Sequence, residues 1–223
     1  VALGWAAWKT YLGRGETDWH HLASLNQLGQ SLDFNGRHAE GLQVLNTAWS
    51  LLKRNDAITN RIGSEIAVVS SIASCYSNLK DISKALEMER ILFARKKIAY
   101  EPTSPILIEA GLNLACALNN FGWQLHGESM PLILETLSLA QKHLGEDSTT
   151  TTCLHEVRAF TLMGHPTPAL VDVQDAIRIL EEAVARRKRF LGNVHPLTER
   201  ARQKIGRAKE QLRRARPGPS RFA

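Results

Sequence analysis

The residues that most resemble a chemical site are a cysteine, a histidine and a glutamate close together in the sequence, Cys153, His155 and Glu156. These side chains can bind zinc, but the neighbouring sequence has no further ligands and no CxxC, CxxH or HExxH spacing. His20 and His21 are adjacent, so on a helix their side chains point about 100° apart and cannot chelate one ion together. The sequence therefore predicts structural roles for these residues, with no metal and no cofactor.

Motifs for catalysis are also missing from the sequence. It contains no Gly-rich phosphate loop, no GxSxG turn and no paired-carboxylate motif. Glu181 and Glu182 lie beside a run of arginines and are typical of a solvated helix face. Cys75, Cys116 and Cys153 lie far apart, which favours small buried apolar roles in a reducing compartment. We predict that the protein is not an enzyme.

Positive charge is concentrated at the C-terminal end. The chain carries a net charge of +6, and residues 186–223 contain 13 Lys and Arg against 2 Asp and Glu. Such a cluster could bind the phosphates of a nucleic acid in a salt-dependent way. Only one aromatic residue, Phe190, lies among the cations, so few side chains are available to stack on bases. The same cations could face an acidic protein or an anionic membrane surface. The candidate basic patch comprises Arg186, Arg187, Lys188, Arg189, Arg200, Arg202, Lys204, Arg207, Lys209, Arg213 and Arg214.

The elements that must position these residues are paired helices in a repeating pattern. In residues 25–52, apolar side chains recur at helical spacing on both sides of a break at Gly36 and Arg37. Gly29 and Gly41 would let the two helices approach closely, forming a hairpin. The pattern recurs after about 44 residues, and two longer copies follow. In the third copy, Pro131 is expected near the start of the second helix, where its missing N–H costs little.

The repeated residues resemble the tetratricopeptide consensus, and the long period resembles its kinesin light chain variety. The residues that carry the resemblance are Leu28, Gly29, Leu32, Gly41, Leu45 and Ala48, with Ile72, Ala73, Tyr76 and Ala85 in the second copy. The segment RKRFLGNVHPLTERA, residues 187–201, resembles that variety's link between repeats. In this link we expect Gly192 to cap one helix in a left-handed conformation, Pro196 to prevent its continuation and Thr198 to cap the next helix. His195 is expected to pack or hydrogen-bond locally.

The resemblance implies an all-α fold, a right-handed α-solenoid of about four helical hairpins with a capping helix at each end. The expected parts are an N-terminal cap at 1–17, an array at 18–198 divided into 18–60, 61–104, 105–148 and 149–198, a basic capping helix at 199–216 and a flexible tail at 217–223. Trp5, Trp8 and Tyr11 would cover the first hairpin or form an aromatic docking patch. Because the chain begins with Val1, we expect a removed targeting segment or a longer parent chain.

Stacked hairpins predict a scaffold whose first helices line a concave groove for a partner peptide or helix. The scaffold could also be a fixed subunit of a larger complex. The alternative is an RNA-binding or ribonucleoprotein-assembly component that uses the basic end. No stretch reaches the roughly 18 apolar residues of a membrane span, and an intracellular, reducing compartment is expected. Polar positions expected to face the groove are Asn26, Gln30, Asn78, Asn113, Asn119, Asn120 and Arg158.

Overall fold

The computed structural model describes residues 5–6, 9, 19–54, 58 and 60–215 of the 223-residue chain. These residues form helices joined by turns and short loops, without a strand. Most of the expected N-terminal cap, including Trp8 and Tyr11, lies outside the described residues, as does the expected tail at 217–223. The predicted all-α class is confirmed.

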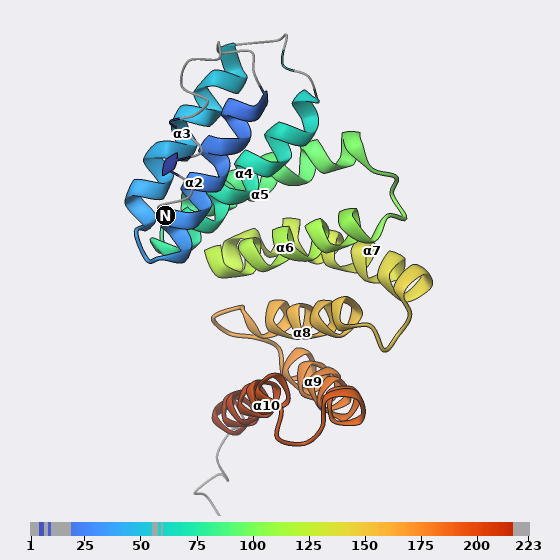
Figure 1. The fold of residues 1–223 in the computed structure, drawn as a ribbon. Coiled ribbons are helices and arrows are strands. Elements are labelled where there is room, and N and C mark those ends of the chain that lie inside the picture. Colours follow the sequence, from blue (N-terminus) through green and yellow to red (C-terminus); the bar gives the residue numbers. More distant parts are fainter. Residues whose placement is uncertain (1–4, 7–8, 10–18, 55–57, 59, 216–223) are drawn as a thin grey trace, which may run out of the picture. The chain divides into compact units, whose positions relative to one another are not determined.

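The structure divides into two compact units, residues 1–117 and residues 118–223. The first unit contains two helical hairpins, which Figure 1 shows in blue to green. In the first hairpin, α2 (Trp19–Phe34) packs against α3 (His38–Arg54), and in the second, α4 (Arg61–Asn78) packs against α5 (Ile82–Ala99). The boundary falls inside α6 (Pro105–Phe121).

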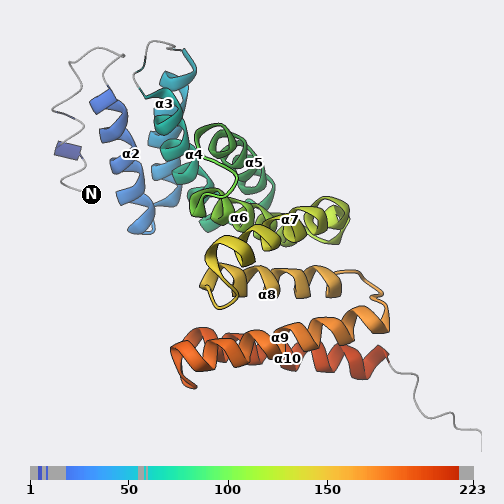
Figure 2. The same cartoon turned by 90° about the vertical axis from the view of Figure 1, so that its right-hand side faces the viewer.

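The second unit contains a 3-10 turn, η1 (Trp123–Leu125), followed by α7 (His126–Leu144), α8 (Thr149–Met163), α9 (Leu170–Leu191) and α10 (Pro196–Ala215). α8 and α9 form a hairpin, α7 packs against α8, and α10 lies alongside α9, as Figure 2 shows. α10 turns one face toward α9: Ala208 is fully buried, and Ile205 and Leu212 pack against the same cluster. This amphipathic helix agrees with its sequence pattern, while its role as a cap stays a prediction.

The first hairpin closes around two glycines that the repeat pattern singled out. A Cβ atom on Gly41 would lie 2.8 Å from the backbone oxygen of Gly29, and one on Gly29 would lie 2.4 Å from Cγ of Leu45. Leu28, Leu32 and Leu45 are buried in the same seam. The absence of side chains at both positions is therefore what lets the two backbones touch.

Substituting Gly41→Ala should destabilise the protein by about 1 to 3 kcal/mol, because the new methyl group meets a backbone atom that cannot rotate away. Chemical denaturation followed by circular dichroism measures the change. Gly127→Ala in α7 is the matched control, since a Cβ there has no atom within 4 Å. That variant should be more stable by up to about 1 kcal/mol through helix propensity. Equal effects at both positions would contradict the close-packing argument.

The links after α7 and α9 have the same local structure. Gly145 has φ 87° and ψ 160°, and Gly192 has φ 85° and ψ 170°. Six residues after each glycine, a threonine hydroxyl donates to the glycine carbonyl: Thr151 to Gly145 at 2.8 Å, and Thr198 to Gly192 at 3.0 Å. The link is thus a repeated structural unit, like the hairpin itself.

Three details of the links and turns differ from expectation. Gly192 has a positive φ but an extended ψ, so it is not in the left-handed helical conformation. Thr198 lies inside α10 and donates to the preceding link; His195 caps the helix instead, its Nδ1 accepting from the N–H of Leu197 at 3.2 Å. Pro131 lies in the second turn of α7, because that helix begins at His126.

None of the described helices is both long enough and apolar enough to cross a membrane. None of the three cysteines, all within the described part of the chain, forms a disulfide. Cys75 is buried, whereas Cys116 and Cys153 are half-buried. Burial, together with the nearby charge of Asp33, raises the pKa of the Cys75 thiol to about 12, so the thiol is protonated at neutral pH.

Candidate functional site

The predicted site is the face formed by the first helix of each repeat. In chain order the first helices of the four predicted repeats are α2, α4, α6 and α8, and the second helices are α3, α5, α7 and α9. The helix predicted as a cap, α10, follows in the position of a further first helix. In the first unit, α2 and α4 contact each other directly. Polar side chains along this contact include several of the predicted groove residues.

Asn26 and Gln30 on α2 both bond to Ser71 on α4. The Ser71 hydroxyl donates to the amide oxygen of Asn26 at 2.8 Å, and Gln30 Nε2 donates to the Ser71 oxygen at 2.9 Å. Asn26 is half-buried and Gln30 is exposed. These two predicted groove residues therefore also hold the first helices of repeats one and two together.

Asn78 takes part in a second network, centred on the buried carboxylate of Asp33. Its Nδ2 donates to both Asp33 oxygens at 3.0 and 3.1 Å, Ser74 donates to one at 2.8 Å, and Nδ1 of His38 lies 2.6 Å from the other. Burial raises the pKa of Asp33, but the hydrogen bonds, chiefly from Asn78, outweigh it and hold that pKa below its ordinary value. Asp33 was not among the residues predicted from sequence; its only signal was a charged residue within an apolar helix pattern.

Asn119 occupies the same repeat position as Asp33 and makes the corresponding contact in the second unit. Its amide donates to the carbonyl of Val157 at 3.1 Å and accepts from the hydroxyl of Thr161 at 2.8 Å. Both partners lie on the next first helix, α8. Asn113 and Asn120 are exposed on α6, and Arg158 on α8 is half-buried.

A hollow of about 360 Å³ lies between α2 and α4, and we call it the α2–α4 hollow. Apolar atoms of Leu22 and Val68 form part of it, with amide groups at its edge. It contains two of the predicted groove residues. Other residues that line it are Ala23, Asn26, Gln27, Gln30, Ser64 and Ala67.

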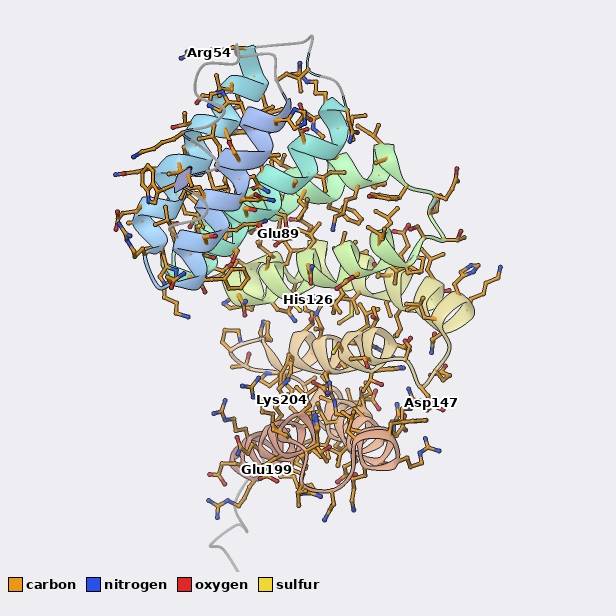
Figure 3. The ribbon with its side chains drawn as sticks, viewed as in Figure 1. Arg54, Glu89, His126, Asp147, Glu199 and Lys204 are labelled. Carbon is orange, nitrogen blue, oxygen red and sulfur yellow. The ribbon has the colours of Figure 1, made fainter. Side chains whose placement is uncertain are left out.

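The second unit has a larger hollow, of about 860 Å³, between α8 and α10, the α8–α10 hollow. Phe160, Met163 and Gly164 line it from the α8 side. Lys204 and Arg207 line it from α10, and Lys204 Nζ lies 4.4 Å from the centroid of the Phe160 ring. Figure 3 shows Lys204 on the helix that faces α8. This hollow, too, lies between two first helices.

The predicted basic patch is extensively paired with carboxylates. Arg187 is only 6% exposed, and its Nε lies 2.8 Å from Oε1 of Glu156. Lys204 Nζ lies 3.0 Å from Oε2 of the same buried carboxylate. Arg187 therefore cannot bind a phosphate at the surface, contrary to its place in the predicted patch. A similar buried carboxylate, Glu65 in α4, lies within 2.9 Å of Arg61 and 2.7 Å of Arg95.

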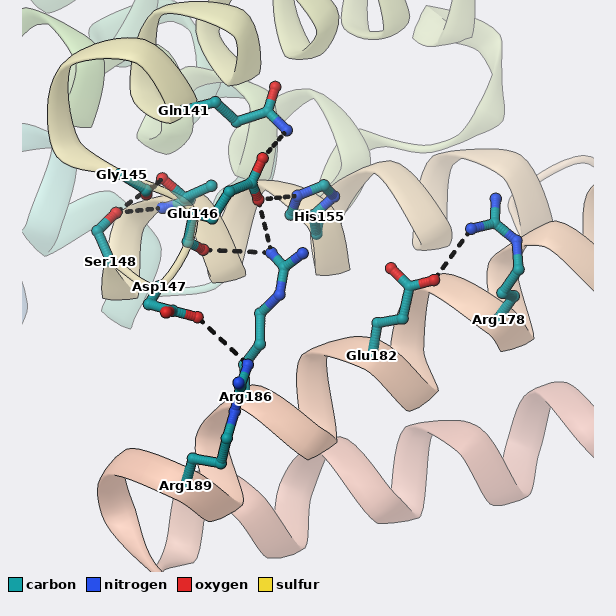
Figure 4. Close-up of polar contacts among 11 residues, drawn as sticks. Gln141, Gly145, Glu146, Asp147, Ser148, His155, Arg178, Glu182, Arg186 and Arg189 are labelled. Atoms are coloured by element: carbon teal, nitrogen blue, oxygen red, sulfur yellow. Dashed lines mark hydrogen bonds and ion pairs between the residues drawn. The ribbon is translucent and has the colours of Figure 1, made fainter.

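Other cations of the patch pair with acids at the surface. Arg186 lies 3.0 Å from Glu146 and Arg189 lies 3.4 Å from Asp147, and both acids belong to the link after α7 (Figure 4). On α10 the pairs are Arg202 with Glu199, Lys209 with Glu181, and Arg213 with Glu210. Lys188, Arg200 and Arg207 are exposed. This pairing leaves fewer cations for a phosphate backbone than the sequence count suggests.

The Cys153, His155 and Glu156 side chains are not arranged as a metal site. Glu156 holds two cations, while Cys153 Sγ accepts from Arg187 Nη2 at 3.5 Å. Burial, and after it the charge of Arg186, lowers the pKa of His155, which favours the neutral imidazole. Among the described residues, no group of three or more His, Cys, Asp or Glu side chains is placed to hold a metal ion.

The paired helices, in an order repeated along the chain, define a tetratricopeptide-like helical repeat fold. The chain is similar to the crystal structure of BtubC (BKLC) from P. vanneervenii, with a TM-score of 0.66 and 15% sequence identity over 100% of this chain and 94% of that one. Two crystal structures of a Podosopora anserina protein, described as a kinesin light chain with nearly identical TPR-like repeats, each give a TM-score of 0.59. They share 19% and 18% identity and cover 87% and 91% of this chain, and 93% and 96% of theirs.

No protein-family model matches the sequence, and no curated protein sequence matches it. The likeness is therefore one of fold, at low sequence identity. It confirms the predicted helical repeat class.

Proposed function

We propose that this protein is a non-catalytic scaffold that binds a partner peptide or helix along its first helices. The observation that carries the proposal is the position of the hollows. The α2–α4 hollow and the α8–α10 hollow each lie between successive first helices, one in each unit. Each combines apolar atoms with polar groups at its edge, the pattern by which a groove holds a polypeptide.

The α2–α4 hollow has groups suited to a peptide backbone. Gln27 and Gln30 are exposed at its edge, and a carboxamide can both donate to and accept from a peptide group. Asn26 and Gln30 are already bonded to Ser71, so their positions are fixed before a partner arrives. Prearranged polar groups reduce the entropy lost on binding. A scaffold of this kind could act alone or as a fixed subunit of a larger complex.

Filling the α2–α4 hollow tests the proposal. Peptides are first selected from a random display library against the whole protein. Replacing Ala67 by Trp should then lower their affinity at least about tenfold, because the indole would occupy the space that the peptide needs. Fluorescence anisotropy with labelled peptide measures the change. The matched control is Ala94→Trp, an exposed alanine on the second helix α5, which should bind as the parent does.

Two results would contradict the proposal. The first is a selection that yields no peptides competing for one site. The second is a set of selected peptides that bind equally well to both tryptophan variants. The first outcome would contradict a peptide-binding scaffold, and the second would contradict recognition at the α2–α4 hollow.

A further inference from the structure

The end of α9 and the link to α10 expose three apolar side chains. Phe190 is 62% exposed, Leu191 40% and Val194 92%. We call these three residues the 190–194 tip. Phe190 and Leu191 are the last two residues of α9, and Val194 lies in the link before α10 begins at Pro196, so all three fall within five residues of sequence. Large apolar side chains gathered on an exposed turn mark a binding surface more often than scattered ones do.

The preceding link shows that the local fold does not require apolar residues at the tip. Gly145 and Gly192 have matching backbone angles, and Thr151 and Thr198 make matching hydrogen bonds to them. In this register Val194 takes the place of Asp147 and Phe190 takes the place of His143, while Leu191 matches Leu144 and is apolar in both links. Two of the three tip positions are thus polar in one link and apolar in the other. The apolar residues at the tip are not explained by the structure of the turn.

Cations surround the tip. Lys188 on α9 and Arg200 on α10 are exposed, and Arg189 is 65% exposed although it lies 3.4 Å from Asp147. Arg202 is paired with Glu199, which is the only acidic residue between positions 186 and 204 of the sequence. The corresponding stretch around the preceding link contains Glu146 and Asp147. The tip therefore has more cations than acids around it, whereas in the earlier link Glu146 and Asp147 balance the charges of Arg186 and Arg189.

We propose that the 190–194 tip docks on an anionic lipid surface. The three apolar side chains would enter the boundary between headgroups and acyl chains, while Lys188, Arg189 and Arg200 contact the headgroups. The shape favours a membrane over a protein groove, because the apolar residues project outward, Val194 almost completely. Neither contribution alone is strong, so binding should be reversible and should require both. This docking surface is separate from the first-helix hollows of the proposed scaffold function.

Vesicle co-sedimentation of the full chain tests the proposal. Phosphatidylcholine vesicles containing phosphatidylserine should bind the protein, and vesicles of phosphatidylcholine alone should not. The double substitution Val194→Asp with Phe190→His copies the preceding link, whose backbone is the same, and should weaken binding about tenfold or more. Val194→Trp should instead strengthen binding, since tryptophan favours the membrane interface. The matched control is Phe34→His. Phe34 is 90% exposed at the end of α2 in the first unit, and this variant should bind as the parent does.

Each other outcome counts against the proposal. If the double variant binds anionic vesicles as well as the parent does, the cations alone attract the lipid and the tip has no role. If neutral vesicles bind equally, charge has no role. Val194→Trp keeps the link apolar and is measured in parallel. If this variant binds no more tightly than the parent, the tip does not enter the lipid interface.

Discussion

Replacing Arg187 by methionine should lower the free energy of unfolding by about 3 to 5 kcal/mol, because the substitution leaves the Glu156 carboxylate buried without its main partner. Arg187 is 6% exposed and joins α9 to α8, and Lys204 of α10 reaches the other oxygen of Glu156. Methionine keeps most of the aliphatic volume of arginine. The decrease in the free energy of unfolding therefore reports the lost charge pairing more than lost packing. Urea denaturation followed by circular dichroism is the measurement.

Arg189→Met is the control for this first prediction. Arg189 lies two residues further along the same helix, is 65% exposed and lies 3.4 Å from Asp147, so its loss should change stability by no more than about 0.5 kcal/mol. A double-mutant cycle with Glu156→Gln then isolates the coupling between the two buried groups. Equal costs for the two arginine substitutions would refute the assignment of Arg187 to a buried ion pair.

The second large effect is expected at Asp33. Substituting Asp33→Asn should cost about 2 to 3 kcal/mol near neutral pH, because it removes a charged acceptor and brings an N–H donor toward the Asn78 amide. Asp81→Asn is the control. Asp81 caps α5 by accepting from the N–H of Lys84, and asparagine caps a helix as well as aspartate does. Asp81→Asn should therefore change the free energy of unfolding by no more than about 0.5 kcal/mol.

The pH dependence gives a second measurement of the same site. Folding lowers the pKa of Asp33 below its ordinary value of 3.8. The ionised carboxylate therefore stabilises the folded state above that ordinary pKa, and this contribution is lost as pH falls through the lowered, folded-state pKa. The stability difference between the parent and Asp33→Asn should thus be constant near neutral pH and should shrink below about pH 4. A difference that stays unchanged in strong acid would contradict the hydrogen-bonded network.

The sequence was sufficient to predict the fold because repeat packing depends on local spacing. Gly36 separates two apolar helical patterns, and the structure breaks the helix there, with α2 ending at Phe34 and α3 beginning at His38. Gly29 and Gly41 lack side chains where the two backbones touch. Each of these features depends on neighbours within one hairpin, which a periodic pattern reveals directly.

The candidate site was only partly predictable. Alternation along a helix indicates which positions face away from the hairpin core, but it does not indicate what the side chains there will meet. Asn26, Asn78 and Asn119 were predicted to face a groove, and each bonds to a first helix of another repeat. Their availability to a partner stays a prediction. The α2–α4 hollow, which contains Asn26 and Gln30, supports that prediction for the first unit.

The sequence by itself determined the helices, their pairing and their repeat, since these follow from the spacing of apolar and small residues along the chain. Only the tertiary structure decided how the charges are used. A count of cations gave Arg187 the same weight as Lys188, yet one is buried against Glu156 and the other is exposed. The physical reason is that an ion pair depends on the approach of residues about 30 positions apart, here Glu156 and Arg187. Periodicity places helices side by side, but the rotation of each helix about its own axis decides which charges meet.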